Sequence, residues 1–307
     1  MKISHLMKGI TASVFGAAML LTGTTANAAW DCKEVTFIVP YSPGGGSDQM
    51  ARRLQPGLEE ALGVSVNIVY KTGGGGAVGF SELHRSKPDG CTISNVVVPN
   101  VIISSKGEGV GYKPDDFAYI GMTESSAGTL MVPKDSPYKT IEAFIAGAKE
   151  KPGMLTVAGT GGSGADRWAQ LAEVLGIEAT YVPVSGGVGK MMPMLAGSHV
   201  DAAATGANHA TKHSGIVDSI LIAGSNEVST LPGVPTEPDW NYVVTWGIMA
   251  PPGTPADYVE ALNVALNSAA SKPEVREALL KGGYVPHIQT VAEVNAFMAD
   301  EIAKLAD

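Results

Sequence analysis

The stretch Val35–Gly63 reads VTFIVPYSPGGGSDQMARRLQPGLEEALG, and the rest of the chain can be read outward from it. Its β-branched, apolar start Val35–Val39 predicts a buried strand. A glycine-rich turn, Tyr41–Gly46, follows, and Ser47 and Asp48 then open an amphipathic helix. Such a turn points backbone N–H groups and the positive end of a helix dipole at an anion. The ligand contacts predicted here are Tyr41, Ser42, Gly44, Gly45, Gly46, Ser47 and Asp48.

The same pattern returns in the middle of the chain. Leu155–Ala158 is a short apolar run, Gly159–Gly164 is a second glycine turn, and Asp166–Leu175 has the apolar spacing of a helix. Because each turn belongs to its own β-α-β unit, we predict an α/β protein with two similar lobes whose helix N-termini face one cleft. The contacts predicted on the second lobe are Thr160, Gly161, Gly162 and Ser163, with Thr205 at the end of a later strand.

The composition is that of a globular protein with room for two cores and an acidic surface. The chain has 307 residues, of which 45% are hydrophobic and 17% charged, and its formal net charge is −9. Net acidity argues against nucleic acid and anionic membranes as partners. An anionic ligand must then be held by local dipoles and hydrogen bonds rather than by a basic surface.

The N-terminal residues have the pattern of a secretory signal peptide. Lys2 and Lys8 form a basic start, Ile10–Leu21 is an apolar core, and Ala26–Ala28 fits an A-x-A cleavage site. The apolar run is short for a membrane-spanning helix, although an uncleaved anchor is the alternative. We therefore expect residues 1–28 to be removed after Ala28 and the mature protein to reach the periplasm.

Two cysteines, Cys32 and Cys91, are present in the whole chain. Cys32 precedes the first predicted strand, and Cys91 precedes the apolar run Thr92–Val98, which is the third. If these strands are parallel neighbours, both cysteines lie at the same edge of the sheet, and an exported protein can form the disulfide. The alternative interpretation is a pair of unpaired, buried thiols.

Patterns for other chemistries are weak. Gly74–Gly79 and Gly159–Gly164 match G-x-G-x-x-G, but neither is followed about 20 residues later by the acid of a dinucleotide site. His209 and His213 have the i, i+4 spacing of zinc ligands without a recognisable third ligand, so a solvated helix face is the better interpretation. No G-x-S-x-G elbow is present. We expect no cofactor, no metal and no catalysis; the alternative is an exported hydrolase or transferase with one turn as its oxyanion hole.

Four segments are of special interest and follow one another along the chain in the order VPYSPGGGSDQMARRL, PDGCTI, YVPVSGGVGKMMPMLAGSHVDAA and WGIMAPPGTP. These segments resemble the substrate-binding proteins of tripartite tricarboxylate transporters, the Bug family. The resemblance implies a type II periplasmic binding protein fold, with two α/β domains, two crossover segments and a ligand between them. It also implies a small carboxylate as ligand and integral-membrane transporter subunits as partners. A ligand-presenting partner of a sensor is an alternative that the sequence does not separate from transport.

The family's Pro-Tyr-x-Gly turn corresponds to Pro183–Gly186, which adds Ser185 and Gly186 to the predicted contacts. Val184 replaces the usual aromatic residue there, so the pocket wall is expected to differ. Cys91 stands where the family usually has tyrosine, which with Cys32 indicates a subgroup with a disulfide.

We expect a monomer with lobe one formed by residues 29–125 and 250–307 and lobe two by residues 126–249. Asp48 either supports its turn from behind or contacts a ligand amine or hydroxyl. Arg167 is expected to be solvated, and the alternative is that it reaches a second carboxylate of the ligand. Binding is expected to rely on backbone donors rather than on arginine.

Overall fold

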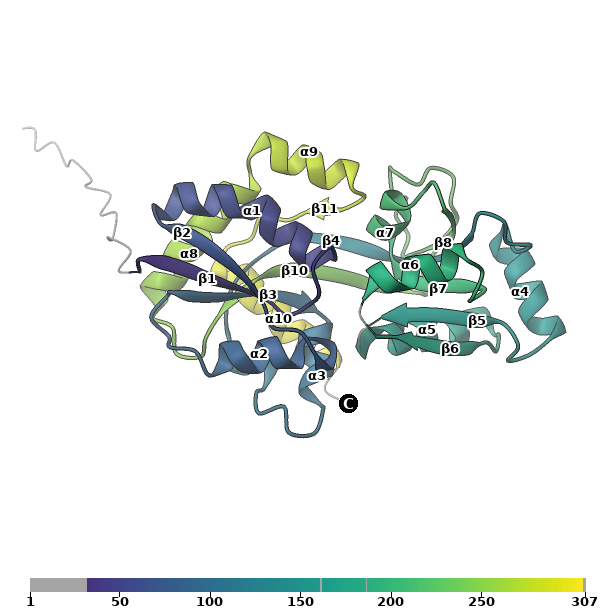
Figure 1. The fold of residues 1–307 in the computed structure, drawn as a ribbon, viewed down its shortest axis with the longest axis horizontal. Helices are drawn as coiled ribbons and strands as arrows, with labels where there is room; N and C mark the ends of the chain where they lie inside the picture. The colour runs from purple at the N-terminus through teal and green to yellow at the C-terminus, as the bar shows by residue number, and fades with distance from the viewer. Residues whose placement is uncertain (1–31, 161, 186, 306–307) are drawn as a thin grey trace, which may run out of the picture.

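The computed structural model describes residues 32–160, 162–185 and 187–305, which form two α/β lobes side by side (Figure 1). The predicted signal peptide lies outside these residues. In lobe one, β1 (Glu34–Val39) lies between β2 (Ser65–Tyr70) and β3 (Thr92–Val98), and the three strands are parallel. β10 (Val243–Ala250) then pairs antiparallel with β3 and with the first half of β4 (Ala118–Pro133).

Helices cover both faces of the lobe-one sheet, as the near-continuous apolar strands require. Val35, Phe37 and Val39 of β1 pack on one face in a core that includes residues of the long helices α1 and α8, whereas Ile38 packs on the other face. The helices and short 3₁₀ turns of this lobe are α1 (Gly46–Leu62), η1 (Gly74–Gly76), α2 (Ala77–His84), α3 (Asn100–Ser105), η2 (Pro114–Asp116), α8 (Ala256–Ala270), α9 (Pro273–Lys281) and α10 (Val291–Lys304).

Lobe two repeats the layered arrangement on a smaller scale. β5 (Thr156–Thr160) is parallel to β6 (Thr180–Val184) and to β7 (Ala202–Gly206), and β7 pairs with the second half of β4. β8 (Val217–Ala223) lies on the other side of β4 and pairs with β9 (Thr236–Glu237). The helices of this lobe are α4 (Ile141–Glu150), α5 (Gly162–Leu175), α6 (Val188–Ala196) and α7 (Ala207–Lys212).

The chain passes between the lobes twice. β4 pairs with β10 over Ala118–Ala127 and with β7 and β8 over Gly128–Pro133, so the first crossing falls near the predicted residue 125. All of β10 pairs within the lobe-one sheet, from Val243 to Ala250. The second crossing therefore precedes β10, and the predicted boundary at residue 249 is too late in the chain. A short strand, β11 (Val285–Pro286), adds to β4 at the first crossing.

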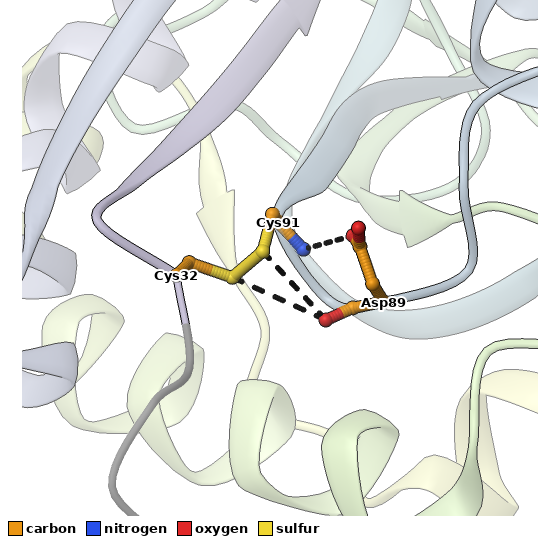
Figure 2. The surroundings of a disulfide bond; sticks show 3 residues. All are labelled: Cys32, Asp89 and Cys91. Carbon is orange, nitrogen blue, oxygen red and sulfur yellow. Dashed lines mark hydrogen bonds between the residues drawn. A yellow bond between two sulfur atoms is a disulfide. The ribbon is translucent and has the colours of Figure 1, made fainter.

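The predicted disulfide between Cys32 and Cys91 is confirmed (Figure 2). Thr36 of β1 pairs with Thr92 of β3, so the residues just before both strands lie together at one edge of the sheet. The two Cα atoms are 5.5 Å apart, within the ordinary range for a disulfide. The bond ties the start of β1 to the loop that precedes β3.

Within the described ranges, no helix is both long and apolar enough to cross a membrane.

Candidate ligand-binding cleft

A cavity of about 550 Å³ opens between the two lobes, within the size range of small-molecule sites. Both glycine turns predicted from the sequence contribute to it. The predicted contacts that line it are Tyr41, Ser42, Gly45, Gly46, Ser47, Thr160, Ser185 and Thr205. Gly44 and Asp48 are not among the lining residues. Gly161, Gly186 and the side chain of Ser163 lie outside what the structure describes, and Gly162 is the first residue of α5.

The first turn presents the N-terminus of α1 to the cavity. Gly45 is the N-cap residue of α1 and has an extended backbone conformation. No side-chain hydrogen bond caps this end of the helix. Ser47 is therefore inside the helix and does not cap it. Because no side chain occupies the first N–H groups of α1 and the helix dipole is positive here, this end of the cavity favours an anion. A Cβ at Gly45 would meet only the Ser42 carbonyl oxygen, at 3.6 Å.

Asp48 holds this turn from behind. Its carboxylate accepts hydrogen bonds from the Gly44 N–H at 2.8 Å, from the Tyr70 hydroxyl at 2.6 Å and from Arg52 Nε at 2.8 Å. Burial acts to raise the pKa of Asp48, but these hydrogen bonds and the charge of Arg52 lower it below its usual value. The carboxylate is thus ionised and paired with groups of its own lobe, and Asp48 is not among the residues that line the cavity.

Trp246 of β10 lies against the start of α1. A Cβ added at Gly46 would lie 3.0 Å from the Trp246 ring, a tight contact, so glycine suits this close packing. Trp246 also lines the cavity and packs edge-on against Tyr284, with ring centroids 5.7 Å apart. β10, which follows the second crossing, therefore supplies an aromatic wall beside the helix N-terminus.

A third glycine loop, Gly73–Gly76, lines the cavity from lobe one. Its four glycines all have positive φ, a conformation that side chains rarely adopt. The Tyr41 hydroxyl donates to the Gly75 carbonyl oxygen at 3.1 Å, which joins this loop to the first turn. In the sequence this loop matches only a weak dinucleotide-binding pattern. The run of consecutive glycines was the feature that could have indicated its place in the cavity.

On lobe two, α5 begins at Gly162, one turn earlier than predicted. The reason is close packing around Tyr181 of β6. A Cβ at Gly159 or Gly164 would lie 2.8 Å or 2.4 Å from the Tyr181 hydroxyl, so these glycines let the start of α5 approach the sheet. The glycines of the second turn thus serve helix–sheet packing as well as access to the cavity.

Arg167 is buried, and the prediction of a solvated side chain is wrong. It is 3% exposed and lines the cavity. Nη1 donates to the Ala204 carbonyl oxygen at 3.2 Å, and the guanidinium carbon lies 4.1 Å from the centroid of the Tyr242 ring. Nε is buried and has no hydrogen-bond partner.

His209 is also buried and lines the cavity, so the expectation of a solvated face is wrong for this residue. Burial, reinforced by the positive charges of His213, Arg167 and Lys212, lowers the pKa of His209 to about 3. The imidazole is therefore neutral at physiological pH. No group of three or more His, Cys, Asp or Glu side chains in the described part of the chain is arranged to hold a metal ion.

Two α/β lobes, two crossings of the chain and a cavity between the lobes define a periplasmic binding protein of type II. A family model described as "Tripartite tricarboxylate transporter family receptor" matches residues 50–307. The chain belongs to this family, as the resemblance implied.

Relatives and solved structures agree with this assignment. The chain is 30% identical over 301 residues to the "UPF0065 protein in tcbD-tcbE intergenic region" of Pseudomonas sp. (strain P51), covering 93% of this chain and 88% of that one. It is 28% identical to protein BugT of Bordetella pertussis, over 96% of this chain and 94% of BugT. The structure of MatC from Rhodopseudomonas palustris with bound malate is similar at a TM-score of 0.81 and 25% identity, over 89% of this chain and 97% of MatC.

Proposed function

We propose that this chain is a periplasmic receptor that captures a small carboxylate between its lobes and delivers it to the membrane subunits of a tripartite transporter. The observation that carries the proposal is the cavity, which the N-terminus of α1 enters from one lobe and Arg167 enters from the other. Family membership and the malate bound to the similar MatC support a carboxylate as the ligand.

Binding would rely on hydrogen bonds and the helix dipole, without any chemical change of the ligand. Each charge-assisted hydrogen bond contributes roughly 1.5–3 kcal/mol. The helix terminus adds about 0.3–1 kcal/mol, and up to about 2 when partly buried. A few such contacts are enough for affinities in the micromolar range or tighter. Incubation of the protein with carboxylic esters tests this point, since turnover would favour the exported hydrolase instead.

Glycine variants test whether the turns form the site. A valine at Gly45 or Gly189 meets no close neighbour in the free protein, because a Cβ at Gly45 has one contact at 3.6 Å and a Cβ at Gly189 has none within 4 Å. Both glycines line the cavity, from opposite lobes. Gly45→Val and Gly189→Val should therefore fold normally and place methyl groups where the ligand approaches.

We expect each variant to lose two or more ligand contacts, or about 3 kcal/mol and more than a hundredfold in affinity. The matched control is Gly215→Val, because Gly215 is exposed, outside the cavity, and equally free of close neighbours. Calorimetric titration with malate, citrate and adipate measures the affinities, and thermal unfolding measures folding. Wild-type binding by Gly45→Val would show that the α1 turn is not the ligand site.

A further inference from the structure

The guanidinium of Arg167 is a buried cation without a counter-ion. No ion pair within the described residues includes it, and the cavity lining that the structure describes holds no aspartate or glutamate. Among the described residues, the one acceptor of its N–H groups is the carbonyl oxygen of Ala204. An ionised side chain removed from water is costly unless it is paired, so a ligand anion would complete its surroundings.

The guanidinium is also held in one plane. Tyr242 stacks against it at 4.1 Å, and the bond from Nη1 to Ala204 fixes its rotation. A guanidinium in a fixed plane offers two parallel N–H donors that match the two oxygens of a carboxylate. The neutral His209 beside it adds no second positive charge to this end of the cavity.

The part of the cavity that lobe one lines favours an anion by different means. There the lining residues at the start of α1 are Gly45, Gly46 and Ser47, which carry no charge and offer backbone N–H groups. Asp48 is close in sequence, but its carboxylate is already bonded to Gly44, Tyr70 and Arg52. The two anion-favouring places thus belong to different lobes and do not share a residue.

Apolar side chains also line the cavity. Val97 and Val244 line it together with Trp246, and Val184 and Val188 line it from lobe two. The hydrocarbon part of a ligand gains by leaving water against these side chains. The cavity therefore suits a molecule that carries acidic groups on a hydrocarbon frame.

We propose that Arg167 forms an ion pair with a second acidic group of the ligand, so that this receptor selects organic dianions over monoanions. One carboxylate binds at the α1 turn of lobe one, and the other binds Arg167 of lobe two. This inference rests on the proposed function and names its ligand class. It also makes Arg167 a specificity residue, since it would discriminate by charge at one end of the ligand.

A thermodynamic cycle between protein and ligand tests the pairing. The ligands are succinate, glutarate, adipate, malate and citrate, and the tightest binder is compared with its analogue in which one carboxylate is a neutral amide. Both are titrated into the wild type and into Arg167→Met, which keeps length and removes charge. Arg85→Met is the matched control, because Arg85 is 67% exposed and paired with Glu82 outside the cavity.

We expect the wild type to prefer the diacid over its monoamide by about thirtyfold or more, and Arg167→Met to lose that preference. Arg85→Met should keep it. Free Arg167→Met should melt at the wild-type temperature or above, because a buried unpaired charge has been removed. This readout separates a ligand partner from a structural residue, whose loss would lower the melting temperature and weaken both ligands equally.

Each outcome decides the inference. A wild type that binds carboxylates but prefers the diacid by less than about threefold would overturn it, and so would an Arg167→Met variant that retains the preference. Equal loss of both ligands with a lower melting temperature would assign Arg167 a structural role. A wild type that binds neither the acids nor simple monocarboxylates would instead overturn the proposed function.

Discussion

Replacement of Glu124 by glutamine in the crossing strand should destabilise the protein by about 3 kcal/mol. Glu124 is fully buried, and Arg53 of α1 donates to its two carboxylate oxygens at 2.5 and 2.6 Å. The Arg53 side chain is 14% exposed and also lies over the Tyr284 ring, 5.4 Å from its centroid. Glu124→Gln would leave the guanidinium buried without a counter-charge. Breaking a buried ion pair from one side costs about 3–5 kcal/mol, and the remaining exposure of Arg53 places the expected value at the lower end.

Urea unfolding followed by circular dichroism measures this cost. The matched control is Glu277→Gln, which breaks an exposed i, i+4 pair with Lys281 and should cost about 0.5 kcal/mol or less. The double variant Arg53→Met, Glu124→Leu should recover most of the stability, since apolar replacement of both partners removes the unpaired charge. A loss below about 1 kcal/mol for Glu124→Gln would refute the claim that this pair anchors α1 to the crossing strand.

Two further predictions concern the disulfide and acid stability. The double variant Cys32→Ser, Cys91→Ser should lose about 4 kcal/mol by the loop-entropy model, measured by urea unfolding; an unchanged midpoint would contradict it. Because the folded-state pKa of His209 is about 3, the unfolded chain binds a proton below pH 6.5 that the folded protein does not. Stability should therefore fall as the pH is lowered from 6.5 toward 4, by up to roughly 1.4 kcal/mol per pH unit from this group. His209→Asn should flatten the profile, whereas the same change at the exposed His199 should not; equal slopes in all three proteins would refute this.

Much of the fold was predictable because local patterns and packing agree. The strand Thr92–Val98 has the predicted bounds, since turn residues flank it at both ends. The disulfide followed from two cysteines that each enter a strand, once those strands are neighbours. The first turn was readable because a glycine run between strand and helix has few structural alternatives.

The second crossing was less predictable. Val243–Ala250 is apolar throughout, and an apolar run of this kind does not reveal which sheet it joins. Its partners β3 and β4 are distant in sequence, so the pairing depends on tertiary structure. The burial of Asn208 and His209 in the short helix α7 was missed for a related reason, because the sequence of this helix is polar.

The wrong prediction for Arg167 arose because the predicted helix starts one turn later than α5 does. The predicted helix began at Asp166, and its apolar face was read forward from Trp168. In the structure α5 begins at Gly162, and Gly164, Arg167, Trp168 and Leu171 are buried at i, i+3, i+4 and i+7. Extending the stripe from Trp168 and Leu171 back by one turn would have placed Arg167 on the inner face.

The two halves of the cavity therefore differ in what a sequence can reveal about them. The glycines of the α1 turn indicate accessible backbone N–H groups, because a residue without a side chain leaves its backbone open to a ligand. For a buried arginine, the sequence gives one indication, which is the position of the residue around the helix axis. An arginine next to a mostly apolar helix face is easily assigned to solvent. In a protein of net charge −9, however, a buried arginine facing a cavity without acids has no general role in solubility. The described residues supply no counter-ion that would offset its desolvation, and this is the partner that the proposed second acidic group of the ligand would bring.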